Sequence, residues 1–405
     1  MGASLKKDLR VSRVRPEESL NAFFFLFIGV LSQKLVVVRK TARSLVQVQN
    51  GPVVPRKRIE EAFDSFMHAP LGLGRLRVCN DRVGEQYPNL DWDVLGFGVV
   101  STDDTYIMKC SIEETFLLGK LVPYGNIELN PSVDCRSLEL WTGLKAYRRR
   151  DGRTQLFRPE QNALRMKMGA ERLCMPSPSV EQFIDAVPPP GKALYLRSLP
   201  MGNGPILGLA PAPEFTFLVF STPVGNYHEG RPALNLFVDN KIHKAIPGRT
   251  GGVKSITNHS PNQAKAKGYS DVFFLDCING KYVEEVSASI HGTILPGITR
   301  MSSIDIAHSF GYQVKERLIR VEDLLEADEV FCTGTAVVVN PVGNVTYQDK
   351  RVEYKTGKEA LSDKLYETLT RIQTGCIEGK MGWTLEVNVQ DIFTTTPYFE
   401  PDKII

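Results

Sequence analysis

The 405-residue sequence has few cysteines and histidines, and neither residue type is spaced as a metal site requires. Its seven cysteines lie far apart with no CxxC pair, and its six histidines include no HxxxH pair. Structural zinc sites and disulfide frameworks are built from such closely spaced residues, so neither is expected here. Dispersed, odd-numbered cysteines are typical of reduced thiols, which predicts a reducing compartment and no metal cofactor.

The sequence also lacks an apolar run long enough to cross a membrane. Residues 22–31, AFFFLFIGVL, carry no charged side chain, but a membrane-spanning helix needs about 20 apolar residues. The long, partly acidic segment before this run and the missing small-residue cleavage site argue against a secretory signal peptide. We therefore expect neither a membrane segment nor secretion.

A strong excess of basic residues is missing as well. The chain has 49 Lys and Arg against 46 Asp and Glu, a formal net charge of +3. Nine of the basic residues and only three acids fall within residues 1–50, so the remainder of the chain is slightly acidic. Nucleic-acid-binding faces need clustered positive charge to displace counterions from phosphates, so we expect no nucleic-acid partner.

The N-terminal part of the chain does contain a basic, acid-poor stretch from residue 34 to residue 48. This composition is compatible with an organelle transit segment, although the stretch is poor in serine. We expect residues 1–84 to form an N-terminal extension that is mostly disordered. The slightly favoured destination is the chloroplast, with the mitochondrion and the cytoplasm as alternatives.

From about residue 90 the chain acquires the patterns of regular secondary structure. Short β-rich runs bounded by Gly or Pro predict strands at 94–100, 105–111, 193–199, 215–225 and 234–240. Apolar residues at helical spacing predict helices at 159–173, 179–187, 298–311 and 357–375. This mixture predicts an α+β protein, with a small domain at 85–222, a linker at 223–230, a large domain at 231–388 and a tail at 389–405.

Four short segments of the second half carry groups suited to an anionic cofactor. They are GGVK at 251–254, EEVS at 284–287, PGITR at 296–300 and CTGTA at 332–336. Glycines let a ring approach the backbone, and free N–H groups at a helix start favour phosphate. Each segment alone has an ordinary explanation: a surface lysine, a solvated strand end, a helix cap or a turn. Only their combination and order are specific.

Together with other segments, these four resemble the branched-chain amino-acid aminotransferases of plants, which use pyridoxal 5′-phosphate (PLP) and have fold type IV. The resemblance extends from about residue 90 to residue 387. It implies a small α+β domain, a linker and a larger domain of strands and helices, with PLP between the domains. The segments that carry it are GNIEL (125–129), GLKAYRR (143–149), LFRPEQNALRMKMGAERLCMPSPSVEQF (156–183), LGLAPAPEFTFLVFSTPVGNY (207–227), GGVKSITN (251–258), AKAKGYSDVFFLD (264–276), KYVEEVS (281–287), GTILPGITR (292–300) and LLEADEVFCTGTAVVVNPVG (324–343).

The resemblance implies a role for each candidate residue. Lys254 matches the Schiff-base lysine, whose amine must be neutral to attack an aldehyde and then carries a proton between substrate and cofactor. Glu285, rather than Glu284, matches the acid that pairs with the pyridine nitrogen. For Tyr195 and Arg197, a half-buried strand tyrosine and a rim arginine remain the alternative. The implied phosphate cradle is Arg165, Ile298, Thr299 and Thr335, and the implied substrate site is Trp141, Tyr195, Arg197, Thr335 and Ala336.

The sequence departs from the family pattern in several places. Family members carry a tyrosine after Asn258 that bonds the cofactor's O3′, whereas this chain has His259. An imidazole can also donate a hydrogen bond, so His259 stays a cofactor-binding candidate. Residues are missing between well-matched blocks near 187–188, 261–264 and 289–292, which shortens a helix after His259 and removes a hairpin after Glu285.

The implied reaction is reversible amino transfer between leucine, isoleucine or valine and 2-oxoglutarate, which becomes glutamate, in a homodimer. Two alternatives stay open. One is a D-amino-acid aminotransferase or an aminodeoxychorismate lyase of the same fold, which the segment LGLAPAPEF disfavours. The other is a homologue that keeps the scaffold without turnover, because the missing segments would loosen the support of the site.

Overall fold

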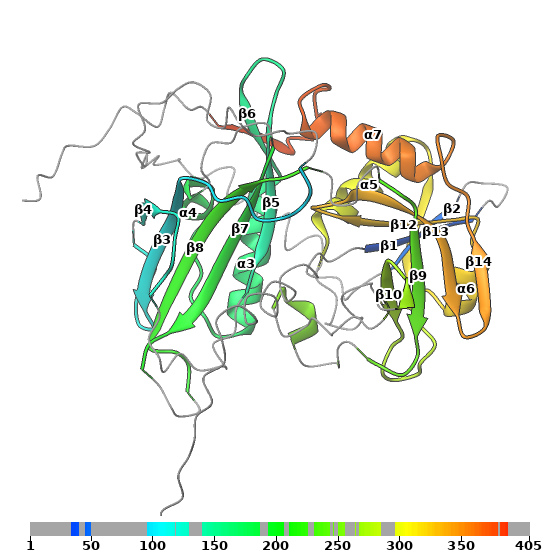
Figure 1. Ribbon diagram of the computed structural model, residues 1–405, viewed down its shortest axis with the longest axis horizontal. Helices are drawn as coiled ribbons and strands as arrows, with labels where there is room; N and C mark the ends of the chain where they lie inside the picture. Colours follow the sequence, from blue (N-terminus) through cyan, green and yellow to red (C-terminus); the bar gives the residue numbers. More distant parts are fainter. Residues whose placement is uncertain are drawn as a thin grey trace, which may run out of the picture. The chain divides into compact units, whose positions relative to one another are not determined.

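The computed structural model describes two β-sheets and their covering helices (Figure 1). By its contacts the chain divides into the units Met1–Val30 and Leu31–Ile405, and every described residue belongs to the second unit. For residues 34–39, 45–49 and 193 only the backbone is described. The described residues are 34–39, 45–49, 95–117, 119–128, 140–186, 193–205, 210–225, 231–243, 246, 250–255, 264, 267–284, 296–379 and 381–387.

The first sheet has seven strands, all paired antiparallel, in the order β15-β6-β5-β7-β8-β3-β4. Helix α3 (Pro159–Arg172) packs on β5, and α4 (Val180–Asp185) packs on α3. Buried side chains such as Met108, Leu156 and Phe217 form its core. The strands are β3 (Asp104–Ser111), β4 (Lys120–Pro123), β5 (Thr142–Arg148), β6 (Thr154–Phe157), β7 (Ala193–Asn203), β8 (Glu214–Pro223) and β15 (Thr384–Val387).

The second sheet is mixed and has the order β10-β9-β13-β12-β1-β2-β11, with β14 paired to β13. The pairs β10/β9, β13/β9 and β11/β2 are parallel, and the others are antiparallel. Helix α5 (Ile298–Ser309) packs on β12, and α7 (Leu361–Gln373) packs on β13. The other elements are β1 (Lys34–Arg39), β2 (Leu45–Gln49), β9 (Leu234–Asp239), the 3₁₀ turn η1 (Thr250–Gly252), β10 (Asp271–Phe274), β11 (Gln313–Arg317), α6 (Val321–Leu325), β12 (Glu329–Gly334), β13 (Val338–Tyr347) and β14 (Lys350–Glu353).

The helices begin and end at residues whose chemistry explains the boundary. Pro159 opens α3, where a missing N–H is harmless. Ser179 and Gln182 form a reciprocal capping box at the start of α4, with distances of 3.1 and 2.9 Å. At the start of α7 the buried carboxylate of Glu329 accepts the amides of Leu361 and Ser362 at 2.9 and 2.8 Å. These contacts fix where each helix starts.

Most predicted elements are confirmed. The strands predicted at 105–111, 193–199, 215–225 and 234–240 correspond to β3, β7, β8 and β9, and the four predicted helices correspond to α3, α4, α5 and α7. The strand predicted at 94–100 is wrong, because residues 95–100 form no strand. The amide of Val100 donates to the Thr222 side chain at 2.8 Å, and Gly96 accepts from the Gly225 amide at 3.0 Å. Isolated bonds of this kind replace a continuous ladder.

Two segments pair with a sheet that the predicted domain boundaries do not assign to them. Within the expected extension, β1 and β2 form a hairpin inside the second sheet. Near the end of the expected large domain, β15 pairs with β6 in the first sheet. The domain boundaries, including the linker at 223–230, otherwise stay predictions. No helix among the described residues is long and apolar enough to span a bilayer.

Candidate active site

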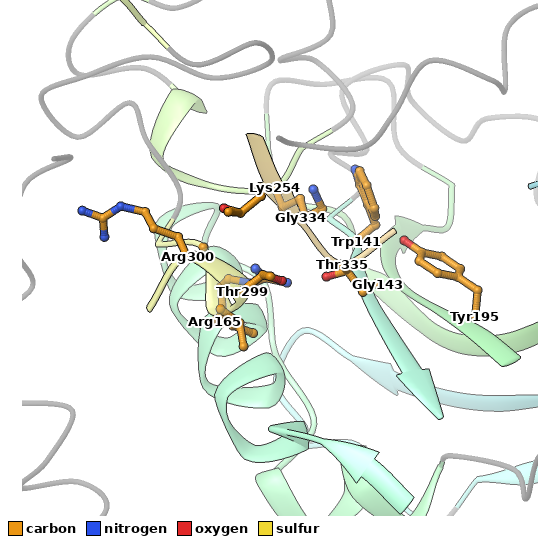
Figure 2. A pocket seen from close by; sticks show the side chains of 12 residues that line it. Trp141, Gly143, Arg165, Tyr195, Lys254, Thr299, Arg300, Gly334 and Thr335 are labelled. Atoms are coloured by element: carbon orange, nitrogen blue, oxygen red, sulfur yellow. The ribbon is translucent and has the colours of Figure 1, made fainter. Parts of the chain in front are cut away.

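A pocket forms where residues of both sheets meet (Figure 2). It encloses about 350 Å³ of space free of atoms, counting the part open to solvent. Its walls come from β5 and β7, from α3, from the start of α5, from the end of β12 and from the segment after η1. The lining residues are Trp141, Gly143, Arg165, Tyr195, Lys254, Gly297, Ile298, Thr299, Arg300, Thr333, Gly334 and Thr335.

Lys254 enters the pocket directly after the 3₁₀ turn. Its backbone is fixed to the first sheet, because its carbonyl accepts the amide of Trp141 at 3.0 Å and a bridge joins Ser255 to Leu140. Its Nζ lies 3.6 Å from the centroid of the Trp141 indole. The lysine predicted to react is therefore a pocket residue packed on an aromatic ring, and it is not a surface amine.

The pairing of β5 with β7 places the aromatic wall. Gly143 lies opposite Arg197 and Lys145 lies opposite Tyr195, so these four residues share one face of the sheet. The guanidinium of Arg197 lies 4.2 Å from the centroid of the Trp141 ring, on which Lys254 also packs. Trp141 thus organises both cations at this side of the pocket.

Tyr195 can reach the pocket because residue 143 has no side chain. A Cβ at Gly143 would overlap the hydroxyl of Tyr195. Tyr195 is buried, and burial raises the pKa of its phenol, while the charges of Arg197 and Arg165 act in the opposite direction. The phenol is therefore a neutral polar group at neutral pH.

Arg165 reaches the pocket from α3. It donates to the hydroxyl of Thr142 at 2.5 Å and to the amide oxygen of Asn162 at 3.0 Å. Thr142 in turn donates to Asn162 at 3.0 Å. This buried network holds the guanidinium in one orientation, as phosphate recognition requires.

The start of α5 supplies backbone donors. Gly297 is its N-cap residue and makes no side-chain cap hydrogen bond. The amides of the first turn have no intrahelical acceptor, and the helix dipole adds partial positive charge there. Ile298, Thr299 and Arg300 all line the pocket, and Arg300 is held by an ion pair with Glu316. The site therefore favours an anion at this end.

The turn between β12 and β13 closes the opposite side. Thr333 and Gly334 at the end of β12 and Thr335 at the start of the turn line the pocket, and β13 begins at Val338, whose φ is +58°. The side chain of Thr333 is fully buried, and its Oγ1 has no hydrogen-bond partner among the described residues. A polar ligand in the pocket would satisfy a buried hydroxyl of this kind.

The structure brings together most of the predicted site residues. Arg197 and Ala336 are not lining residues, but Arg197 contacts Trp141 and Ala336 directly follows Thr335. His259 and Glu285 lie outside the described residues, as do residues 187–188, 261–263 and 289–292 at the places where residues are missing. Those that line the pocket are Trp141, Arg165, Tyr195, Lys254, Ile298, Thr299 and Thr335.

Sequence reasoning missed five lining residues. Gly297, Arg300, Thr333 and Gly334 belong to the PGITR and CTGTA segments and could have been included with their neighbours. Gly143 lies outside both segments. The available signal was its position two residues after Trp141, since alternate residues of a strand lie on one face.

Glu284 is buried, and its amide donates to Phe274 at 2.7 Å. It is not among the lining residues. No cluster of three or more His, Cys, Asp and Glu residues suited to a metal occurs in the described part of the chain.

Comparisons with known proteins agree with this geometry. Residues 284–345 match the family model for amino-transferase class IV. A chloroplastic branched-chain amino acid aminotransferase of Humulus lupulus is 51% identical over 352 residues, covering 77% of this chain and 86% of that protein. A methionine aminotransferase of Arabidopsis thaliana is 47% identical, covering 76% and 96%. A branched-chain aminotransferase of Thermobaculum terrenum, solved in its PLP form, gives a TM-score of 0.57 at 20% identity, covering 71% and 100%.

The alignment with the Humulus protein contains gaps in this chain, because 77% of 405 residues is fewer than the 352 aligned positions. The relative therefore has residues that this chain lacks, which agrees with the missing segments inferred from the sequence. Further relatives are named for the chloroplast or the mitochondrion. At this identity and coverage, the chain belongs to the branched-chain amino-acid aminotransferase family, within the class IV aminotransferases of fold type IV.

Proposed function

We propose that this protein is a PLP-dependent transaminase that moves an amino group reversibly between a branched-chain amino acid and 2-oxoglutarate. The observation that carries the proposal is the convergence of Lys254, the α5 N-terminus and the Thr333–Thr335 segment on one pocket. An amine, a cradle for an anion and a buried unsatisfied hydroxyl together suit a cofactor that has both an aldehyde and a phosphate.

The residues present fit PLP. The amides of Ile298 and Thr299, the hydroxyl of Thr335 and the guanidinium of Arg165 would hold its phosphate, since all four residues line the pocket. The unpartnered hydroxyl of Thr333 supports a polar ligand beside them. Bound PLP supplies the electron sink that lets an amino acid lose its α-hydrogen.

Lys254 and Glu285 would perform the acid–base work. The Nζ of Lys254 is held over Trp141 within the pocket, so it can accept and return a proton at the substrate α-carbon. Glu285 would keep the ring nitrogen protonated, and His259 would donate a hydrogen bond to the ring oxygen. These two assignments rest on the family resemblance.

The substrate site would lie between the aromatic wall and the Thr335–Ala336 turn. The amides of Thr335 and Ala336 would bind the α-carboxylate. Trp141 and Tyr195 would contact the side chain, with Arg197 available for the second carboxylate of glutamate. Because one aligned relative is named for methionine, leucine, isoleucine, valine and methionine should be tried as donors side by side.

We further propose a homodimer and a plastid location. The dimer follows from the family resemblance, and the location follows from the relatives named chloroplastic. Relatives of similar identity are named mitochondrial, so the mitochondrion is the alternative compartment.

Absorbance spectroscopy of the purified, PLP-loaded protein tests the proposal. A yellow colour that shifts on addition of leucine, with leucine-dependent formation of glutamate from 2-oxoglutarate, is the expected result. Lys254→Ala should abolish the colour and the shift. Lys241→Ala, at an exposed lysine outside the pocket, is the matched control and should keep both.

A second candidate function is a scaffold that binds the cofactor without turnover. The gaps in the alignment favour it, because a loosened support of the site abolishes catalysis easily. A yellow protein whose spectrum does not respond to any of the four amino acids would support the scaffold and refute the transaminase.

A further inference from the structure

Lys145 is a buried cation that the proposed chemistry does not use. It lies on β5 two residues after Gly143, and the residue is 8% exposed. Its Nζ donates to the backbone carbonyl of Ala336 at 2.9 Å and lies 5.9 Å from the ring centroid of Phe97. No carboxylate among the described residues lies within ion-pair distance of it. A cation buried without an acid is costly, which argues that its single strong contact is useful.

That contact joins the two sheets at the substrate site. Lys145 belongs to the first sheet, whereas Ala336 lies in the turn between β12 and β13 of the second sheet. This hydrogen bond holds the peptide plane between Ala336 and Val337 and anchors the turn to the first sheet. The Thr335 and Ala336 amides belong to the two preceding peptide units of the same segment, so the anchor limits their movement relative to the first sheet.

We propose that Lys145 is a positioning residue that orients the Thr335–Ala336 amides for the substrate carboxylate. The inference rests on the proposed function and adds to it. The amino acid and 2-oxoglutarate each present a carboxylate to the same donors. Loss of the lysine amine should therefore weaken binding of both substrates together, without removing the phosphate cradle on α3 and α5.

The test is Lys145→Met, which keeps a long apolar side chain but removes the donor. We expect KM for leucine and for 2-oxoglutarate to rise by about 10-fold each, because donors that are no longer preorganised must be ordered when the carboxylate binds. The PLP absorbance should stay, and kcat should change much less than KM. Lys145→Arg, which keeps a cationic donor, should recover part of the affinity. Lys109→Met, at an exposed lysine of β3, is the control and should behave as wild type.

Two results would overturn the inference. One is unchanged KM values in Lys145→Met, which would mean that the contact does not affect the substrate site. The other is a loss of thermal stability and kcat with no selective effect on KM, which would indicate a purely structural role. A wild-type protein without PLP colour or turnover would instead refute the proposed function, and this inference with it.

A second inference comes from the hairpin formed by β1 and β2. Strand β1 pairs antiparallel with β12, and β2 pairs parallel with β11. The hairpin therefore occupies the position between β12 and β11 in the second sheet. Strand β12 ends in the pocket residues Thr333 and Gly334, and β11 follows α5, whose start lines the pocket. Strands β12 and β11, which connect to two of the elements that would hold the phosphate, thus adjoin the hairpin.

We infer that strands β1 and β2 are a permanent part of the folded enzyme and are not removed with a targeting segment. Strands β11 and β12 each present one edge to this hairpin, and its absence would leave both edges unpaired. Any proteolytic maturation of the N-terminal region must then end before Lys34. This assigns a structural role to a stretch whose composition alone suggested a transit segment.

The strand register provides a direct test. Leu35 lies opposite Cys332, and Val36 lies opposite Phe331. Directly opposed residues of antiparallel strands have Cα atoms about 4.5–5.5 Å apart, within the range that a disulfide spans. Leu35→Cys should therefore form a disulfide with the native Cys332 when the protein is refolded in an oxidising glutathione buffer. Mass spectrometry of the non-reduced peptides detects the link.

Val36→Cys is the matched control, because a residue one step along the strand lies on the opposite face of the sheet. It should not link to Cys332. Equal linkage in both variants, or none in either, would refute the pairing. In parallel, removal of residues 2–33 should leave the melting temperature and PLP absorbance unchanged, whereas removal of residues 2–50 should lower both. Equal behaviour of the two truncations would refute the structural role.

Discussion

Because Lys145 is buried, we expect the stability of the protein to depend on pH in a specific way. Burial lowers the pKa of its ammonium from 10.5 to about 8 in the folded protein. Below pH 8 the folded state must therefore keep a charge in an apolar environment that the unfolded chain exposes to water. Between pH 8 and the pKa of the unfolded chain, the folded state has lost the proton while the unfolded state retains it. The destabilising effect of burial is thus complete at neutral pH and is relieved as pH rises.

The size of the effect follows from the two pKa values. Between pH 7 and pH 9.5, linkage predicts that the free energy of unfolding contributed by Lys145 rises by about 2 kcal/mol. Lys145→Met has no titrating group at this position and lacks the increase. Tyr195, opposite Lys145 in the β5/β7 pairing, does not interfere, because burial raises the pKa of its phenol above the ordinary value.

Urea denaturation of the wild type and Lys145→Met at several pH values between 7 and 9.5 measures this difference. All other titrating groups are common to both proteins, so the difference between their free energies of unfolding isolates Lys145. We expect the free energy of unfolding of the wild type to increase relative to that of Lys145→Met as pH rises. A difference independent of pH, or one that changes in the opposite direction, would show that the ammonium is not buried as described.

Three further substitutions test other contacts. Gly143→Ala should raise KM for every amino acid and lower the free energy of unfolding by about 1–3 kcal/mol, because the new Cβ overlaps Tyr195. Steady-state kinetics measures KM, and thermal melting measures stability. Wild-type values of both would refute the packing of Tyr195 against Gly143. Arg165→Met should weaken PLP binding by about 10-fold or more, as measured by titration of the apoenzyme, since it removes a charged donor from the pocket. Glu329→Ala should destabilise the protein by about 2–4 kcal/mol in denaturation experiments, because two amides at the start of α7 lose their acceptor; a change below about 0.5 kcal/mol would contradict this.

The parts of the fold that the sequence predicted depend on local signals. The helix from Pro159 and the helix that ends near Gly375 carry apolar spacing and boundary residues within one segment, and both form as expected. The strand predicted at 94–100 was also inferred from a local signal, and that prediction is wrong. Its alternating apolar residues look like a strand, but the bonds made by Val100 and Gly96 go to a side chain and to an isolated amide.

The parts that sequence did not predict depend on contacts between distant segments. Lys145 and Ala336 are 191 positions apart, and no local pattern marks a lysine that will be buried against a carbonyl of another sheet. The pairing of β1 with β12 joins segments that are further apart, and the composition of residues 34–48 suggested a removable targeting segment. Similarly, no residue next to Gly143 in the sequence indicates that the hydroxyl of Tyr195 will occupy the place where a side chain at residue 143 would lie.

Cofactor binding and turnover are separable properties of this chain. The pocket residues that would hold phosphate, Arg165, Thr299 and Thr335, lie on α3, on α5 and after β12, all within described parts of the sheets and their helices. Two of the three places where residues are missing, near 261–264 and 289–292, follow Lys254 and Glu285 in the sequence, the two groups that would perform the acid–base work. If these losses impair the site, proton transfer should fail before phosphate binding does. PLP affinity and the rate of leucine α-hydrogen exchange into deuterated water measure the two properties separately. Tight PLP binding without exchange would assign the defect to the segments around Lys254 and Glu285, whereas weak PLP binding with rapid exchange would contradict this division of roles.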